Sequence, residues 1–271
     1  MNAIESTQNP RSSFVYGPVK SWRFGRSLGI DPIGAVSTCS FNCVYCQLGV
    51  IQDYTTQRQI FVPTSDILSD LQALSTDEQI DVITLSGSGE PTLALNLAEI
   101  LAIAKQEIKR PTVVLTNSTL LGDRMVRRAL QLADIVAVKL DAISSNQLQR
   151  INQPTETINL PHILAGIEQF RGEYSGQLAI QTMLLSPWTT EMIEDYIQLL
   201  QRLHPDEIQL NVPARPRVLV RQLDARGNHA VESSNAAFRK LKCISANVLK
   251  TVADAIYDAT SIPVRCAPIA L

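Results

Sequence analysis

Short apolar runs alternate with longer amphipathic stretches from residue 81 onward. The runs are rich in Val, Ile and Leu, and they predict strands at 81–86, 112–116, 135–140, 178–184 and 207–212, with an earlier strand at 35–38. Between them, apolar residues recur at the helical period, which predicts helices at 96–108, 125–133, 161–170, 191–203 and within 236–259. Alternation of this kind builds βαβ units around a parallel sheet. We therefore expect an α/β fold, a partial (β/α)6 TIM-like barrel with about six units rather than the eight of a closed barrel.

The first thirty residues carry the weakest pattern in the chain. We expect an N-terminal strap at 1–30 and a core domain at 31–271 that ends in a helical and strand extension. In barrels and open parallel sheets, ligands bind at the carboxyl ends of the strands. Polar residues that directly follow a predicted strand are therefore the candidates for a site.

Charge and hydropathy narrow the class of protein. The 271 residues include 24 Lys and Arg against 26 Asp and Glu, a balance that argues against holding duplex nucleic acid by bulk charge. The N-terminus lacks a basic segment followed by an apolar one, and no apolar run approaches the roughly 20 residues that span a bilayer. We expect a cytoplasmic protein with no membrane partner.

Three of the five cysteines, Cys39, Cys43 and Cys46, lie within eight residues, whereas Cys243 and Cys266 lie far downstream. This distribution does not resemble a disulfide framework and instead predicts a metal site. Four-iron clusters are usually held by four cysteines, so three would leave one iron open to a small-molecule ligand. The alternatives are a zinc site with three Cys and one His, or ordinary buried thiols.

The CxxxCxxC spacing, with the aromatic Tyr45 before the last cysteine, resembles the signature of the radical S-adenosylmethionine (radical SAM) enzymes. The resemblance implies a 4Fe-4S cluster on the three cysteines whose open iron chelates the amino and carboxylate groups of S-adenosyl-L-methionine (SAM). It further implies reductive cleavage of SAM to a 5′-deoxyadenosyl radical, a hydrogen abstraction from substrate, and an electron donor such as flavodoxin or ferredoxin. Tyr45 would lie close to the adenine.

A second segment, at residues 85–91, is similar to the Gly-Gly-Glu segment of the same family, with Ser88 in place of the first glycine. Ser88 and Gly89 are small enough for backbone carbonyls to approach a ligand ammonium, and Glu90 adds a carboxylate that would hold the SAM amino group. Taken alone, the same residues would make an ordinary strand-to-helix turn.

Polar residues at later strand ends extend the candidate cofactor site. Asn117 follows the third predicted strand, and Asn211, at the end of the last, is a candidate for the adenine side. Lys139 and Asp141 share a face because they are two residues apart on a strand, so they could bind ribose hydroxyls or the methionyl carboxylate. The alternative is an internal ion pair that satisfies itself.

Residues 16–49 and 210–216 resemble the branch that includes the tRNA wyosine-forming enzymes. Those enzymes carry a second cluster on cysteines before the radical SAM loop, and this chain has no cysteine before Cys39, so we expect one cluster. Basic residues that could border the barrel mouth would receive phosphate or carboxylate groups, or cover the cluster: Arg11, Lys20, Arg23, Arg26, Arg215, Arg217 and Arg221. Trp22 and Phe24 would add aromatic contacts to RNA.

The sequence thus predicts a radical SAM enzyme with an RNA or protein among its candidate substrates. Three alternatives stay open: a wyosine-type tRNA-modifying enzyme, an activase that installs a glycyl radical on a partner protein, and a non-enzymatic zinc or electron-transfer protein.

Overall fold

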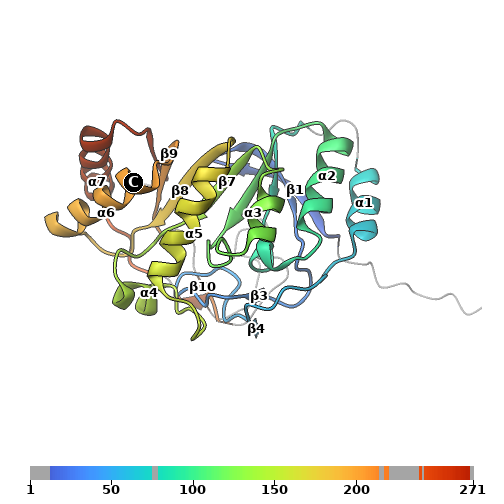
Figure 1. Cartoon of the computed structure of the whole chain (residues 1–271), viewed down its shortest axis with the longest axis horizontal. Helices are drawn as coiled ribbons and strands as arrows, with labels where there is room; N and C mark the ends of the chain where they lie inside the picture. Colours follow the sequence, from blue (N-terminus) through green and yellow to red (C-terminus); the bar gives the residue numbers. More distant parts are fainter. Residues whose placement is uncertain (1–12, 75–78, 214–216, 220–237, 240, 269–271) are drawn as a thin grey trace, which may run out of the picture.

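The computed structural model describes residues 13–74, 79–213, 217–219, 238–239 and 241–268. Their main feature is a curled eight-stranded sheet, which forms the wall of a half-barrel (Figure 1). Every neighbouring pair is parallel except β1 and β2. In spatial order the strands are β1 (Val15–Ser21), β2 (Gly25–Ile30), β5 (Val82–Leu85), β6 (Thr112–Thr116), β7 (Ile135–Lys139), β8 (Gln177–Met183), β9 (Glu207–Asn211) and β12 (Val264–Cys266).

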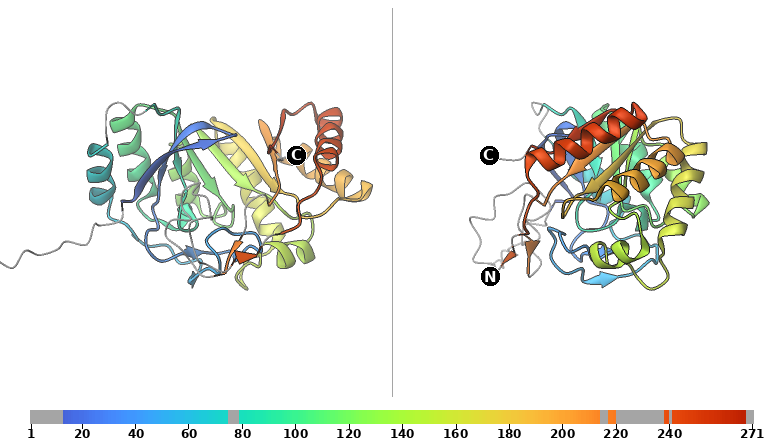
Figure 2. Two further views of the ribbon diagram at one scale, coloured as in Figure 1. Left: turned by 180° about the vertical axis from the view of Figure 1, so that it is seen from behind. Right: turned by 90° about the vertical axis from the view of Figure 1, so that its left-hand side faces the viewer.

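Helices cover the outer face of this sheet, as the two views in Figure 2 show. They are α1 (Thr64–Gln72), α2 (Leu97–Ile108), α3 (Arg124–Leu130), α4 (Ser145–Ile151), α5 (Leu160–Glu173), α6 (Thr190–Leu203) and α7 (Ala246–Thr260). Several begin at a side-chain cap: Ser144, Asn159, Thr189 and Ser245 each accept a hydrogen bond from a backbone N–H in the first turn. The α6 residues Tyr196, Leu200 and Leu203 form its buried stripe.

The two faces of the strands differ in chemistry. Outward positions such as Ile83, Val136 and Ile208 are fully buried in the hydrophobic core beneath the helices. A polar row crosses the other face, because the strand register aligns Lys139 with Gln181, Gln181 with Gln209, and Gln209 with Arg265. The period-two alternation therefore places polar side chains inside the half-barrel and apolar ones outside.

The two edges of the sheet meet at the amino ends of the parallel strands. Arg265 on β12 donates hydrogen bonds to the carbonyl oxygens of Trp22 (2.7 Å) and Arg23 (2.8 Å), which lie in the β1–β2 turn. Its guanidinium also lies 5.9 Å from the Trp22 ring centroid and 3.8 Å from Glu207. We call this set of contacts the Arg265 clasp. It joins the last strand to the first hairpin.

The partial barrel predicted from the sequence is confirmed, and five of its strands lie within two residues of their predicted bounds. The predicted strand at 35–38 overlaps only the short β3 (Thr38–Cys39), whereas β2 supplies the strand of the sheet. Residues 15–30 of the predicted strap form the β1–β2 hairpin. Among the described residues, no helix combines the length and apolar character needed to cross a membrane.

Candidate functional site

The three clustered cysteines lie on the loop that follows β2, which we call the cysteine loop (residues 37–55). The short β3 pairs with β4 (Asp53–Tyr54) inside this loop. On one side, residues 88–90 extend alongside β3: Thr38 N donates to Ser88 O (3.1 Å) and Glu90 N to Thr38 O (3.0 Å). These two hydrogen bonds fix Glu90 beside Cys39.

Gly89 is required for that pairing. A Cβ atom at this position would overlap the carbonyl oxygen of Thr38 and lie 2.7 Å from its carbonyl carbon. Both are backbone atoms, which have no rotamer by which to move away. The glycine predicted to let a backbone approach a ligand therefore lets two backbone segments approach each other.

On the other side, residues 151–155, which comprise the last residue of α4 and the segment that follows it, hydrogen-bond to the cysteine loop. Val44 N donates to Ile151 O (2.9 Å), Asn42 N to Asn152 O (3.0 Å), and Thr155 N to Ser40 O (3.0 Å). The sequence analysis did not predict this segment, because neither its length nor its pattern distinguishes it from an ordinary connection. The cysteine loop is thus held between two backbone segments that come from different βα units.

Two of the three thiols are within hydrogen-bond distance of buried amide groups. Asn117 Nδ2 lies 3.5 Å from Cys39 Sγ, and Asn152 Nδ2 lies 3.4 Å from Cys43 Sγ. Burial raises the pKa of the Cys43 thiol to about 12, with the Asp141 charge as the next cause. Burial also raises the pKa of Cys39 well above its usual range, reinforced by Glu90 and by the Cys43 and Cys46 sulfurs. All three cysteines lie on the cysteine loop, and two of their sulfurs contact amide groups from two different βα units.

Glu90 lies at the start of the 3₁₀ turn Pro91–Leu93, and its side chain is 2% exposed. Its Oε1 accepts hydrogen bonds from the Thr116 hydroxyl (2.6 Å) and from both the backbone N–H and the hydroxyl of Thr92 (3.1 and 2.7 Å). Its Oε2 accepts one, from Asn117 N (2.6 Å). Burial raises the Glu90 pKa, while these donors act in the opposite direction.

Asp141 is the centre of a second polar network. Its Oδ2 accepts from the Tyr45 hydroxyl and from Asn152 Nδ2 (2.7 Å), and its Oδ1 accepts from Met183 N (2.8 Å). Lys139 Nζ lies 3.8 Å from Asp141 Oδ2 and 5.1 Å from the Tyr45 ring centroid. Burial and the Asp141 charge raise the Tyr45 pKa well above its usual range. Lys139 and Asp141 thus form the internal ion pair that was the alternative to ligand binding.

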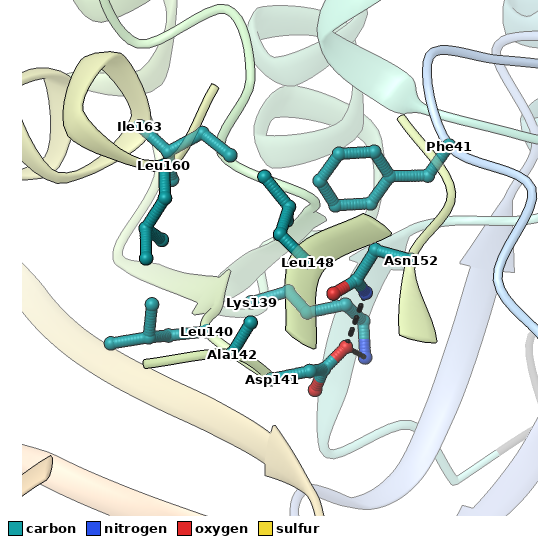
Figure 3. Close-up of a pocket in the computed structure, with 9 residues that line it drawn as sticks. All are labelled: Phe41, Lys139, Leu140, Asp141, Ala142, Leu148, Asn152, Leu160 and Ile163. Atoms are coloured by element: carbon teal, nitrogen blue, oxygen red, sulfur yellow. Dashed lines mark hydrogen bonds and ion pairs between the residues drawn. The ribbon is translucent and has the colours of Figure 1, made fainter. Parts of the chain in front are cut away.

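A small pocket adjoins this network (Figure 3). Lys139, Asp141 and Asn152 lie on one side of it, and apolar residues lie on the other: Phe41, Leu148, Leu160 and Ile163. Its volume is about 10 Å³, roughly the space of a single water molecule. The adenosine part of a nucleoside cofactor would therefore have to bind elsewhere along the strand ends or displace these side chains.

Ser88 is turned away from the cysteine loop and towards Asp31, the residue that follows β2. The Ser88 hydroxyl donates to Asp31 Oδ2 (2.6 Å), and Ser88 N donates to Oδ1 (3.2 Å). Asp31 also accepts from the backbone N–H groups of Ile33 and Gly34. The sequence analysis missed Asp31, although its place at a strand end was a usable signal.

Asn211 ends β9, and its side-chain oxygen accepts a hydrogen bond from Val212 N (2.9 Å). Its register partner on β8 is Met183, whose backbone N–H binds Asp141. Asn211 therefore lies one strand away from the Asp141 network.

Three of the predicted basic residues, Arg23, Arg26 and Arg217, contact other parts of the molecule. The Arg217 guanidinium contacts the cysteine loop, donating to Asn42 Oδ1 (3.3 Å), Gly49 O (3.3 Å) and Val44 O (3.4 Å). Arg26 pairs with Asp81 at 2.8 Å, and the Arg23 guanidinium lies 5.4 Å from the Trp22 ring centroid. Arg11, Arg215 and Arg221 lie outside the described residues.

The donor set fits an iron–sulfur cluster. Over the described part of the chain, no three His, Cys, Asp or Glu side chains are grouped as a single metal ion requires. The three thiols of one loop, two of them near amide donors, instead match the ligands and the hydrogen bonding of a cubane. Cys39, Cys43 and Cys46 are the residues that would hold it.

Comparison with known proteins places the chain in a family whose sequence model covers the cysteine loop and most of the sheet. The sequence model described as the Radical SAM superfamily matches residues 35–212. A UPF0026 protein of Synechocystis sp. is 54% identical over 94% of this chain and 96% of its own length. A UPF0026 protein of Methanocaldococcus jannaschii is 34% identical over 75% of this chain and 64% of its own length.

Among solved structures, a radical SAM methyltransferase from Sphaerobacter thermophilus matches with a TM-score of 0.60 at 14% identity. The match covers 89% of this chain and 65% of that protein, and at this identity it shows a shared fold. The chain therefore spans slightly less than two thirds of this structure and of the Methanocaldococcus relative.

Proposed function

We propose that this chain, which belongs to the radical SAM superfamily, holds one 4Fe-4S cluster on Cys39, Cys43 and Cys46 and uses SAM to abstract a hydrogen atom from its substrate. The observation that carries the proposal is the cysteine loop itself. Its three thiols stand at the carboxyl end of a partial barrel, between residues 88–90 and residues 151–155, with the buried Glu90 carboxylate beside Cys39.

Glu90 is the residue we propose for the SAM amino group. A carboxylate offers about four acceptor positions, and among the described residues Oε2 uses only one of its two, for Asn117 N. The donors on Oε1 come from Thr92 and Thr116, and they hold the carboxylate in one orientation. A ligand ammonium at Oε2 would form a charge-assisted hydrogen bond and favour the ionised carboxylate against its burial.

The other cofactor contacts that we propose follow from the same strand ends. Tyr45 and Asn211 would lie towards the adenine, Ser88 and Gly89 beside the methionyl group, and Asn117 between them. Lys139 and Asp141 would exchange part of their internal pairing for ribose hydroxyls or the methionyl carboxylate. The raised pKa of Tyr45 keeps its hydroxyl protonated, so that it remains a hydrogen-bond donor.

When bound and reduced, a cluster held by Cys39, Cys43 and Cys46 would supply the electron for cleavage of SAM to a 5′-deoxyadenosyl radical. The chain's own residues position the cofactor and exclude water from the radical, which the apolar surroundings of Phe41, Leu148 and Ile163 favour. The electron would come from a small carrier such as flavodoxin or ferredoxin.

Anaerobic reconstitution tests this function. The wild-type protein should bind close to four iron atoms per chain and, with dithionite and SAM, release 5′-deoxyadenosine detectable by chromatography. Cys43→Ala should lose both properties, whereas Cys243→Ala, which changes an exposed thiol, should keep them. Wild-type protein that binds zinc in place of iron, or that reconstitutes fully but forms no 5′-deoxyadenosine, would contradict the proposal.

The contacts of the described residues do not favour a wyosine-type tRNA-modifying enzyme or a zinc protein. RNA recognition by a wyosine-type enzyme would draw on free cationic groups, yet the Arg217 guanidinium binds the cysteine loop and Arg26 pairs with Asp81. A zinc site lacks the required ligand group within the described part. The substrate class that we retain is a small molecule or a partner protein at the open end of the half-barrel.

A further inference from the structure

Two asparagine amides reach the sulfur atoms from opposite sides of the cysteine loop. Asn117 follows β6 and approaches Cys39, while Asn152 follows α4 and approaches Cys43. Their exposed fractions are 7% and 1%, so both amides are withdrawn from water. Hydrogen bonding to cluster sulfurs is one of the means by which a protein sets the potential of an iron–sulfur cluster.

A hydrogen-bond partner fixes the orientation of each amide. For Asn152 the partner is an acceptor, and for Asn117 it is a donor. Asn152 Nδ2 lies 2.7 Å from Asp141 Oδ2, and a carboxylate only accepts hydrogen bonds, so the nitrogen must face this way. One N–H of Asn152 is thereby directed to Asp141, and the second is left for Cys43 Sγ (3.4 Å) and the Tyr45 hydroxyl oxygen (3.5 Å). The oxygen of this amide cannot take the position near the sulfur.

The hydrogen bonds of its side-chain oxygen fix the orientation of the Asn117 amide. Asn117 Oδ1 accepts from Thr119 N (3.1 Å), a backbone group that only donates, and from the Thr119 hydroxyl (2.8 Å). The amide nitrogen must therefore point the other way, towards Ser40 Oγ (2.8 Å) and Cys39 Sγ (3.5 Å). Both side chains present an N–H, rather than a carbonyl oxygen, to a cysteine sulfur.

An N–H that points at sulfur acts on the two redox states unequally. One-electron reduction by an external carrier adds a negative charge to the cluster, part of which resides on the cysteine sulfurs. The partial positive charge of a fixed N–H stabilises that added charge, and a low-dielectric surrounding increases the effect. Nearby carboxylates act in the opposite direction, with Asp141 beside Cys43 and Glu90 beside Cys39.

We propose that Asn117 and Asn152 are positioning residues that raise the reduction potential of the cluster, each offsetting the carboxylate nearest to its cysteine. The inference rests on the proposed function, since it requires the 4Fe-4S cluster. It assigns to Asn152 a role that its sequence context does not indicate, and it gives Asn117 a role in addition to cofactor contact.

The experiment measures midpoint potentials by EPR-monitored redox titration of the reconstituted protein without SAM. Asn152→Leu and Asn117→Leu keep the number and branching of the side-chain heavy atoms and remove the N–H. We expect each to retain iron and to titrate at a more negative potential than the wild type, with a larger shift in the double variant. The matched control is Asn159→Leu, which removes the cap of α5 from an asparagine without a sulfur contact and should destabilise the protein without moving the potential.

The experiment tests the tuning role of the two asparagines separately from the proposed presence of the cluster. Wild-type protein that fails to assemble a cluster would refute the proposed function, whereas an assembled cluster whose potential is unchanged in both leucine variants would refute only the tuning role. If Asn152→Leu alone loses iron, the tuning role is tested by the midpoint potential of Asn117→Leu: a more negative value supports it, and an unchanged value refutes it. Loss of iron in both would overturn tuning and indicate a purely structural role.

Discussion

Gly89→Ala is the substitution for which the structure gives the clearest expectation. The new methyl group would overlap the Thr38 carbonyl oxygen and lie 2.7 Å from its carbonyl carbon and 3.1 Å from its nitrogen. Since all three atoms belong to the backbone, residues 88–90 would have to separate from β3. That separation breaks two hydrogen bonds, Thr38 N to Ser88 O and Glu90 N to Thr38 O.

The loss of folding stability can be estimated from the overlap of the methyl group and from the two broken hydrogen bonds. Forcing a methyl group into a packed interior costs roughly 1–3 kcal/mol. Each buried backbone hydrogen bond that is lost costs about 1 kcal/mol more. We therefore expect Gly89→Ala to lower the free energy of unfolding by about 3–5 kcal/mol. Because Glu90 moves with the strand, iron retention after reconstitution should also fall.

Urea denaturation followed by circular dichroism measures this change on the metal-free protein. The matched control is Gly122→Ala, where a Cβ would meet no heavy atom within 4 Å. Its effect should lie within about 1 kcal/mol of zero, since Gly to Ala chiefly reduces the entropy of the unfolded chain. A Gly89→Ala protein as stable as Gly122→Ala would refute the reasoning.

Three further predictions concern other parts of the molecule. Arg265→Ala removes two hydrogen bonds of the Arg265 clasp and should cost about 1–2 kcal/mol of stability, with faster amide hydrogen exchange in β12. Arg26 lowers the pKa of Asp81 to about 2 from its ordinary 3.8, so the ion pair stabilises the fold above pH 4 and is lost as the pH falls towards 2. The difference in Tm between the wild type and Asp81→Asn should therefore disappear as the pH falls from 4 towards 2. A difference that stays constant over this range would contradict a stabilising ion pair between Arg26 and Asp81. In metal-free protein at pH 8, iodoacetamide should label the exposed Cys243 well before Cys43, whose pKa burial raises to about 12, as peptide mass spectrometry would show.

The barrel was predictable from the sequence because its strands are short, apolar and bounded by helices with a clear period. The sequence predicted a strand in the C-terminal extension but not its bounds, because β12 (Val264–Cys266) is three residues long and carries an arginine at its centre. Helix α4 was missed for a similar reason, since Leu148 is its one buried residue and leaves no stripe to recognise. A helix or strand can be recognised from the local sequence only when several of its residues are buried at regular intervals.

The site was predictable in its residue types but not in its contacts. The cysteine spacing and the SGSGE segment are local signals, and Glu90 does lie beside Cys39. Asn152 approaches Cys43 across 109 positions of sequence, and Arg217 reaches Gly49 across 168. Such pairs are created by topology alone. Lys139 and Asp141 share a face as expected, yet their ion pair depends on Tyr45 and Asn152 from elsewhere in the chain.

The Arg265 clasp has a consequence for synthesis on the ribosome. The first hairpin leaves the exit tunnel well before β12, because 242 positions of sequence separate Arg23 from Arg265. The Trp22 and Arg23 carbonyl groups therefore lack this partner until every strand between them and Arg265 has been synthesised, so the clasp can form only after the intervening strands have left the ribosome.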